Sequence, residues 1–372
     1  MHIVFSSNIS WSIYNFRTPL LKSLKAEGHK ISTVAFKDAY ASKLIEEGFN
    51  FYEININNNA TNPLEDLKTI AAYYKLYKKI KPDVICHNAI KPNIYGTIAA
   101  GLLKIPTVNN ISGLGTLFIK KSFSTYLAKV LYKISQKKAS LVFFQNSDDF
   151  NLFTTSNIVK KEKCRIIPGS GVDTTVFISK EGVSKNSNNF EFLFIGRLLY
   201  DKGIREYVTA AKNIKKRYPN AVFNILGPLY AKNATAVTKE TLDAWVENSV
   251  VNYLGETDNV KEFMQVTNCV VLPSYREGLS KVLIEASSIG VPIITTNVPG
   301  CRDVVVDNVT GFLCKVKDSK DLELKMEKML LASDKERSIM GVNARKRAIN
   351  TFDINIIINH YKNAINDVTS TN

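Results

Sequence analysis

The sequence predicts an α/β protein built from two doubly wound domains, and three observations support this prediction. Its 372 residues are too many for one ordinary hydrophobic core and suggest two domains of roughly 180 residues each. Hydrophobic residues make up 45% of the chain and charged residues 22%, which is the composition of a globular protein. Short apolar runs such as 84–86 alternate with helix-like segments, as in a parallel sheet that is covered on both faces.

Each half of the chain carries its own series of strand-like runs. The expected strands are residues 2–6, 30–36, 50–54, 84–87, 107–111, 141–145 and 164–167, then 190–195, 222–226, 250–254, 269–272 and 292–295. Between the first two runs, Thr18 followed by Pro19 predicts a helix start, because Thr caps helices and Pro fits the first turn. Residues 181–189 are polar and indicate a linker. We therefore expect a first domain over 1–183, a second over 184–352, and a terminal helix over 353–372.

Composition and charge limit the function classes. The five cysteines are scattered and form no C-x-x-C pair, which favours buried thiols in a reducing cytosol. The N-terminus does not resemble a signal peptide, and no apolar run is long enough to cross a membrane, so we expect a cytoplasmic protein. The net charge of +15 is concentrated in the first half and allows three partners: a nucleic acid, an anionic lipid or a phosphorylated substrate. The alternative is a generic lysine-rich surface. No nucleic-acid-binding motif is present, so we expect no nucleic-acid partner.

The segment 123–138 has the pattern of a basic amphipathic helix. Its apolar residues Leu127, Val130, Leu131 and Ile134 fall on one helical face, and lysines flank them. Such a helix either lies on an anionic membrane surface or packs on a protein core with its lysines in water.

The stretch 273–285 concentrates candidate binding residues. Glu277 and Gly278 follow an apolar run, and Glu285 lies eight residues after Glu277, within a helix-like segment. If this stretch is mostly helical, the two carboxylates are separated by about 12 Å, which suits the two ends of one long ligand. The first free N–H groups of the helix lie between them and favour an anion. The alternative is a solvated loop residue and a helix-face residue.

Two cations stand at a neighbouring strand end. Gly196 and Arg197 directly follow the run 190–195, and Lys202 comes five residues after Arg197. Ligands of doubly wound sheets bind at the carboxyl ends of the strands, and Arg and Lys together suit a diphosphate. The alternative is a pair of surface cations.

Several motifs together resemble the retaining glycosyltransferases of family 4. Residues 273–279 with Glu285 are similar to the family's two glutamates separated by seven residues. Within the family, the first half resembles the branch that contains the diacetylbacillosaminyl α-1,3-N-acetylgalactosaminyltransferases of bacterial surface-glycan synthesis. The other matching segments are 194–203, 167–173, 290–305, 11–17, 90–96 and 110–115.

This resemblance implies a GT-B fold, in which two Rossmann-like domains face one another across a cleft and the second holds a UDP-sugar donor. It also implies that the terminal helix, 353–372, packs back toward the first domain. Arg197 and Lys202 would contact the diphosphate, Glu277 the transferred sugar and Glu285 the ribose, with Glu277, Arg197 and Lys202 forming the catalytic group. The full set implied to bind the donor is Gly196, Arg197, Lys202, Glu277, Gly278, Leu279, Ser280 and Glu285. Transfer would retain the anomeric configuration and need no metal or other cofactor, and the sequence contains no D-x-D motif.

The acceptor implied by the resemblance is a saccharide on polyprenyl diphosphate, and an enzyme acting on it would lie at the cytoplasmic face of the inner membrane. The first loop, 6–11, lacks the glycine pair of many relatives, and Asn109 and Asn110 occupy the region where many carry a histidine. His87 is the nearest histidine. Arg17 and Lys91 follow strand ends, and we expect them to bind the acceptor, with one or both pairing with its diphosphate. His87 either takes part in this acceptor site or is a pocket-lining or packed histidine. A UDP-N-acetylglucosamine 2-epimerase, which shares the fold, is the alternative.

Overall fold

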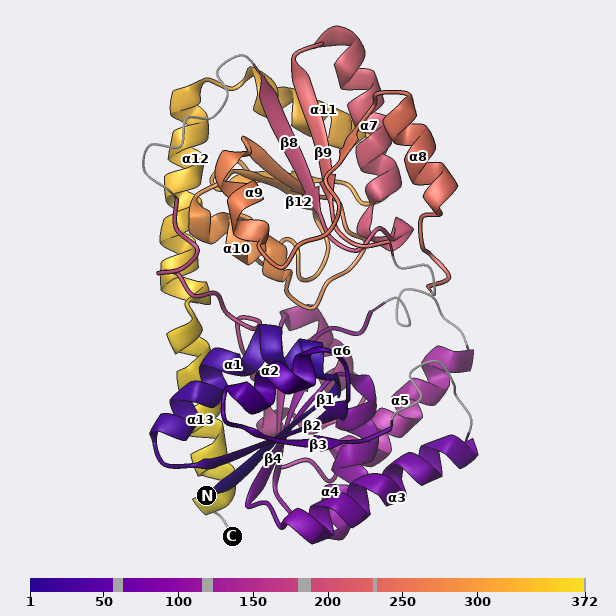
Figure 1. Ribbon diagram of the computed structural model, residues 1–372, viewed down its shortest axis with the longest axis vertical. Coiled ribbons are helices and arrows are strands. Elements are labelled where there is room, and N and C mark those ends of the chain that lie inside the picture. Colours follow the sequence, from indigo (N-terminus) through magenta and orange to yellow (C-terminus); the bar gives the residue numbers. More distant parts are fainter. Residues whose placement is uncertain (56–62, 116–122, 180–188, 230–232, 371–372) are drawn as a thin grey trace. The chain divides into compact units, whose positions relative to one another are not determined.

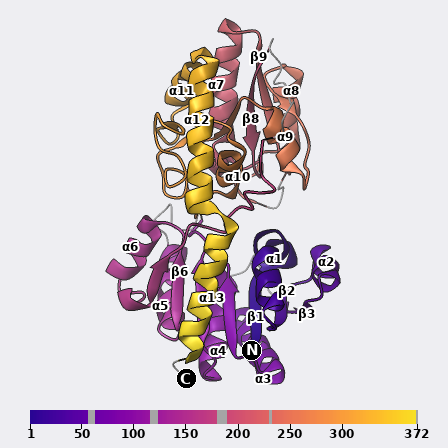
Figure 2. The same ribbon diagram turned by 90° about the vertical axis from the view of Figure 1, so that its left-hand side faces the viewer.

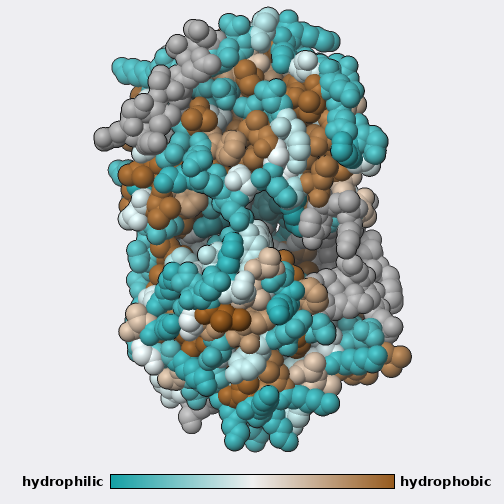
Figure 3. All heavy atoms as spheres, viewed as in Figure 1, coloured by the Kyte–Doolittle hydropathy of each residue, from teal (hydrophilic) through white to brown (hydrophobic). Residues whose placement is uncertain are grey.

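The computed structural model describes residues 1–55, 63–115, 123–179, 189–229 and 233–370. The chain divides into two compact units (Figure 1). Unit 1 comprises Met1–Gly171 and Ile354–Asn372, and unit 2 comprises Val172–Asp353. On the face drawn in Figure 3, hydrophilic and hydrophobic side chains are interspersed. No helix among the described residues is long and apolar enough to cross a membrane.

Unit 1 is built on a seven-stranded parallel sheet with the order β3-β2-β1-β4-β5-β6-β7. Its central strands are fully buried, which confirms the prediction of a parallel sheet covered on both faces. The strands are β1 (His2–Ile9), β2 (Lys30–Phe36), β3 (Asn50–Glu53), β4 (Val84–Asn88), β5 (Thr107–Ile111), β6 (Leu141–Phe144) and β7 (Cys164–Ile166).

Two groups of helices cover the two faces of this sheet. The first group packs through a core that includes Leu20 of α1 and Tyr361 of α13, and Figure 2 shows α13 running along unit 1. The second group packs through a core that includes Tyr73, Tyr132 and Phe153. The helices of unit 1 are α1 (Ser10–Ala26), α2 (Tyr40–Glu46), α3 (Pro63–Ile80), the π-helix η1 (Pro92–Gly96), α4 (Thr97–Leu102), α5 (Phe123–Gln136), α6 (Ser147–Thr155), the 3₁₀ turn η3 (Lys161–Lys163) and α13 (Ile354–Ser370).

Unit 2 repeats this design with a six-stranded parallel sheet of order β10-β9-β8-β11-β12-β13. Its strands are β8 (Phe190–Ile195), β9 (Ala221–Leu226), β10 (Asn252–Tyr253), β11 (Cys269–Leu272), β12 (Ile293–Thr296) and β13 (Gly311–Cys314). Its helices are η4 (Tyr200–Lys202), α7 (Ile204–Arg217), α8 (Lys239–Glu247), α9 (Val260–Val266), α10 (Lys281–Ile289), α11 (Ser319–Leu331), α12 (Asp334–Arg347) and η5 (Ala348–Phe352). In each sheet the strand order reverses beside the first strand, at β1/β4 and at β8/β11. Such a reversal is where doubly wound folds bind ligands.

The structure corrects two sequence predictions and confirms a third. The first helix begins at Ser10, so Pro19 lies inside α1 rather than at its start. The first unit ends at Gly171 rather than at 183, because the Val172 N–H donates to the Phe352 carbonyl (2.9 Å) and ties the following residues to unit 2. Most of the expected linker, 181–189, lies outside the described residues. The terminal helix α13 does pack in unit 1, as predicted.

Candidate functional site

The candidate site of unit 2 lies at the carboxyl ends of β8 and β11, where the strand order reverses. These strands pair directly, with Phe192 opposite Cys269 and Leu193 opposite Val270. Gly196 and Arg197 follow β8, and Arg197 has an exposed side chain. The residues after β11 form the loop that leads into α10. The predicted cations and carboxylates therefore belong to neighbouring strand ends.

The centre of this site is an ion pair between Lys202 and Glu277. The Lys202 ammonium donates a hydrogen bond to Glu277 Oε1 at 2.5 Å. The two side chains are only 20% and 15% exposed, so water screens the pair less than it screens a surface salt bridge. An ammonium has three N–H donors, and this bond uses one of them. Lys202 therefore keeps donors for an anion while it holds Glu277 in place.

Close backbone contacts fix the two loops that carry this pair. The Tyr275 N–H donates to the Asp201 carbonyl at 2.9 Å, and the Ser274 hydroxyl donates to the same carbonyl at 3.3 Å. Gly203 adopts a φ of 75°, and a Cβ there would lie 2.0 Å from the Pro273 carbonyl oxygen. Only glycine allows this approach, so the Asp201–Gly203 turn and the loop after β11 behave as one surface.

A third loop supports Glu277 from the other side. The Glu277 N–H donates to the Pro299 carbonyl at 3.1 Å, and the Ser280 N–H donates to the Gly300 carbonyl at 3.0 Å. A Cβ on Gly300, which has a φ of 77°, would lie 2.5 Å from the Glu277 carbonyl oxygen and 2.6 Å from that of Gly278. The loop after β12 therefore sets the backbone path of residues 277–280.

The helix α10 begins directly after this loop. The side chain of its N-cap residue, Ser280, makes no capping hydrogen bond, and the positive end of the helix dipole lies beside Gly278 and Leu279. An anion placed there would receive the first-turn N–H groups. Because α10 starts at Lys281, the helical spacing that we considered for Glu277 and Glu285 applies only to residues 281–285.

Glu285 is a buried carboxyl group on the second turn of α10. It is 7% exposed, and Lys281 Nζ lies 3.6 Å from its Oε1. Burial raises the pKa of Glu285 above its usual range, and the Lys281 charge opposes that rise. A buried carboxylate is costly to the fold, which favours a binding role over a solvated helix-face role.

The three candidates in unit 1 have different surroundings. Arg17 is buried and donates from Nη2 to Asn88 Oδ1 at 2.9 Å. Lys91 is partly buried, and burial lowers its pKa, whereas Asp66 and Glu65 act in the opposite direction.

His87 lies in a polar network inside unit 1. It is fully buried, its Nδ1 donates to Asn109 Oδ1 at 3.0 Å, and its Nε2 lies 3.0 Å from the Tyr77 hydroxyl. Burial lowers the pKa of His87 to about 4, so the imidazole is neutral near pH 7. Both ring nitrogens are occupied within the protein, which favours a packing role over contact with a ligand.

Sequence reasoning missed the aromatic partner of Arg17. The Arg17 guanidinium carbon lies 5.2 Å from the ring centroid of Tyr361, on α13. The Tyr361 hydroxyl accepts a hydrogen bond from Asn110 Nδ2 at 2.8 Å. Asn88 ends β4 and pairs with Asn110, the last residue but one of the adjacent strand β5, and these two polar residues near the strand ends were the available signal.

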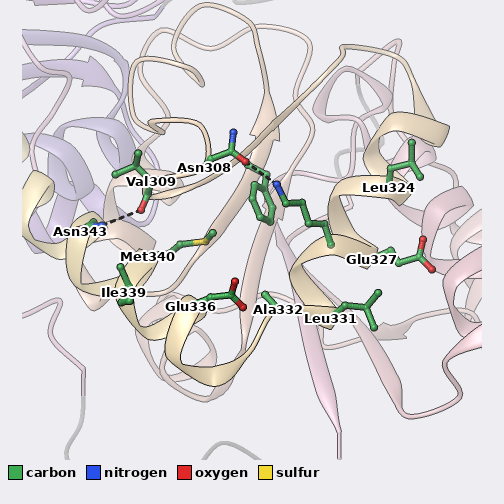
Figure 4. Close-up of a pocket in the computed structure, with 12 residues that line it drawn as sticks. Asn308, Val309, Leu324, Glu327, Leu331, Ala332, Glu336, Ile339, Met340 and Asn343 are labelled. Carbon is green, nitrogen blue, oxygen red and sulfur yellow. Dashed lines mark hydrogen bonds between the residues drawn. The ribbon is translucent and has the colours of Figure 1, made fainter.

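A separate open cavity lies between the Asn308–Phe312 segment, α11 and α12 (Figure 4). The Lys328 ammonium donates to Asn308 Oδ1 at 2.8 Å, and the Asn343 side chain donates to the Val309 carbonyl. Its lining is largely apolar and contains none of the candidate residues. It therefore does not belong to the candidate site.

Comparison with known proteins identifies both halves of the chain. Residues 2–146 match the family described as glycosyl transferase 4-like, and residues 177–347 match the family described as glycosyl transferases group 1. A relative from Campylobacter jejuni, N,N'-diacetylbacillosaminyl-diphospho-undecaprenol alpha-1,3-N-acetylgalactosaminyltransferase, is 30% identical over 97% of this chain and 97% of its own. UDP-Gal:alpha-D-GlcNAc-diphosphoundecaprenol alpha-1,3-galactosyltransferase from Escherichia coli is 27% identical over 78% of each chain.

Solved structures show the same fold at lower identity. Anabaena HepE in complex with UDP and glucose superimposes with a TM-score of 0.79 and 18% identity, covering 98% of this chain and 99% of that one. WaaG, a glycosyltransferase involved in lipopolysaccharide biosynthesis, superimposes with a TM-score of 0.71 and 15% identity, covering 99% of each chain. The predicted GT-B fold class is confirmed.

Proposed function

Since the chain belongs to the group 1 glycosyl transferases, we propose that it transfers a hexose or N-acetylhexosamine from a UDP-sugar to a polyprenyl-diphosphate-linked saccharide. The reaction would serve the synthesis of a bacterial surface polysaccharide. Two relatives that match most of the chain are named for transfer to diphospho-undecaprenol-linked sugars, which supports this acceptor class. The single observation that carries the donor assignment is the Lys202–Glu277 ion pair beside the N-terminus of α10.

The donor site offers one group for each part of a nucleotide sugar. The free N–H donors of Lys202, the Arg197 guanidinium and the start of α10 would bind the diphosphate. Glu277, held by Lys202, would accept hydrogen bonds from hydroxyls of the transferred sugar. Glu285 would accept hydrogen bonds from the ribose hydroxyls, a role that repays the cost of burying its carboxylate.

The same groups would lower the barrier to transfer. As the bond between the anomeric carbon and the diphosphate breaks, negative charge grows on the leaving diphosphate and positive charge on the sugar ring. Lys202, Arg197 and the helix N-terminus would stabilise the first, and the Glu277 carboxylate would stabilise the second. We propose that the acceptor hydroxyl attacks from the face that the diphosphate leaves, with the diphosphate taking the proton, so that the configuration is retained. In this scheme protein groups supply the positive field without a metal.

We also propose that unit 1 contacts an anionic membrane surface through α5, at the cytoplasmic face. On this helix Leu127, Val130 and Leu131 are half-buried, and Ile134 is 49% exposed beside the exposed Lys133. An exposed apolar residue flanked by lysines suits the interface of an anionic bilayer. Binding to anionic liposomes should be released by high salt, and persistent binding to neutral liposomes would contradict this mode.

The proposed transfer is tested by incubating the protein with a panel of nucleotide sugars, with and without a polyprenyl-diphosphate-linked saccharide. We expect sugar transfer that requires the acceptor and prefers a UDP-sugar. Isomerisation of the free UDP-sugar without any acceptor would instead identify a 2-epimerase-like enzyme and refute the proposal.

A further inference from the structure

Arg17 carries a buried positive charge whose hydrogen-bonding capacity is only partly used. The residue is 3% exposed, and arginine remains charged at any ordinary pH. Its Nη2 donates to Asn88 Oδ1, but its buried Nη1 donates to no group among the residues that the structure describes. Within the same residues no carboxylate forms an ion pair with Arg17. A buried charged donor without an acceptor is costly, so a purely structural arginine would normally be satisfied.

Asn88 presents a second unused donor at the same place. Its Oδ1 accepts from Arg17, which fixes the orientation of the amide, because the flipped amide would set two donors against each other. Its Nδ2 is buried and has no partner among the described residues. Arg17 and Asn88 are thus joined by one hydrogen bond and each keeps an unsatisfied N–H group. The complementary ligand carries negative charge and several acceptor oxygens.

The position of the pair in the fold matches a ligand site. Asn88 is the last residue of β4, and β4 pairs with β1 at the point where the strand order of unit 1 reverses. Ligands of doubly wound sheets bind outside the carboxyl ends of the strands at this point. Asn88 is 7% exposed and Arg17 is 3% exposed, so both residues are buried and a small part of Asn88 reaches the surface.

Tyr361 holds the guanidinium in a defined orientation. Its ring lies against Arg17, with 5.2 Å from the guanidinium carbon to the ring centroid, and its hydroxyl is anchored by Asn110. Contact with an aromatic face stabilises the cation without using its N–H donors. Tyr361 is therefore a positioning residue that leaves the donors of Arg17 available.

We infer that Arg17 and Asn88 form a phosphate-binding site, and that this site holds a phosphate of the acceptor's lipid diphosphate. The assignment to the acceptor rests on the proposed function, in which the donor diphosphate is bound by Lys202 and Arg197 of unit 2. The phosphate site itself rests only on the two unsatisfied donors and on the place of Asn88 at the end of β4.

The decisive variant is Asn88→Asp in the full chain. The new carboxylate would pair with Arg17 and satisfy it internally, so the fold should be as stable as wild type or more so. The same carboxylate would repel an incoming phosphate. We expect the KM for a polyprenyl-diphosphate acceptor to rise about 10- to 100-fold, while the KM for the UDP-sugar changes less than about twofold. Arg17→Lys, which keeps the charge but loses the planar fork, should raise the acceptor KM by a smaller factor.

A binding measurement separates this inference from the proposed function. With the donor site saturated by UDP, calorimetry should detect inorganic pyrophosphate binding to wild type and not to Asn88→Asp, whether or not any polyprenyl acceptor is a substrate. Equal pyrophosphate binding by both proteins, or none by wild type, would overturn the phosphate site. If Asn88→Asp weakened UDP binding and left the acceptor KM unchanged, the assignment to the acceptor would be overturned.

Discussion

Replacing Glu285 by glutamine removes the buried charge of α10 and keeps the shape of the side chain. We predict opposite effects on binding and on stability. An ionised carboxylate can accept hydrogen bonds from both ribose hydroxyls, whereas the single amide oxygen of glutamine is a weaker acceptor. Hydrogen bonds to charged groups contribute about 1.5–3 kcal/mol. The affinity for a UDP-sugar should therefore fall roughly 10- to 150-fold.

The stability of the ligand-free protein should change in the other direction. Because burial raises the pKa of Glu285 in the folded protein, folding favours the protonated carboxyl over the ionised one. The ionised group therefore destabilises the fold above its folded pKa, and this cost disappears as the pH falls below the unfolded pKa. Glu285→Gln should raise Tm at pH 8, and the difference from wild type should shrink as the pH is lowered.

The assay is thermal unfolding at pH 8, 7, 6 and 5, with and without UDP-sugar. A nucleotide sugar suits this series because its diphosphate is esterified at both ends and has no ionisation near neutral pH. As the pH is lowered, the affinity of the wild type for the UDP-sugar should begin to fall at a higher pH than it would with an ordinary glutamate at this position. The affinity of Glu285→Gln for the UDP-sugar should show no such fall. Glu262→Gln changes an exposed carboxylate on the neighbouring helix α9 and should leave both quantities unaltered. A Glu285→Gln variant that is less stable at pH 8 and binds UDP-sugar normally would refute the reasoning.

Three further changes test the other parts of the account. Lys202→Ala should lower kcat about 100- to 1,000-fold, because it removes a preorganised cation from the leaving diphosphate. The control Lys212→Ala, on the exposed face of α7, should leave kcat unaltered. Equal kcat values for the two variants would exclude a catalytic role of Lys202. Gly300→Ala should weaken UDP-sugar binding, because the new Cβ would press against the Glu277 carbonyl. Gly255 is the matched control: it has a similar φ of 79°, but no heavy atom lies within 4 Å of a new Cβ. Gly255→Ala should therefore show only backbone strain. Unaltered donor binding by Gly300→Ala would show that this loop does not position residues 277–280. The lowered pKa of His87 predicts that the free energy of unfolding falls as the pH drops from 7 toward 5, since only the unfolded histidine gains a proton there. His87→Gln should reduce this slope in urea titrations, and an unaltered slope would contradict the assignment.

The donor side of the molecule was predictable because its parts are local in the sequence. The strand end, the loop with Glu277 and the start of α10 follow one another within a short stretch, and Lys202 occupies the equivalent place after β8. Their pairing across 75 positions follows once β8 and β11 are recognised as neighbours. The roles of these residues toward a donor stay predictions until binding is measured.

The parts that could not be predicted depend on contacts between distant residues. Thr18 and Pro19 are a typical helix start, but residues from Ser10 onward are already helical, and Ile13 and Arg17 are buried on the inner face of that helix. The polar stretch 181–189 indicated a linker by composition, whereas the boundary follows from the bond between Val172 and Phe352. The resemblance implied that α13 packs on unit 1, but no local pattern indicated that Tyr361 would lie against Arg17.

The anomeric configuration of the product tests the central claim most directly. A purified UDP-sugar of defined configuration is incubated with a polyprenyl-diphosphate-linked saccharide, and the new glycosidic bond is examined by nuclear magnetic resonance. The account predicts transfer with the donor's configuration retained, at a rate that depends on Lys202. An inverted linkage, or a UDP-sugar that changes its ring configuration while the acceptor stays unmodified, would contradict it.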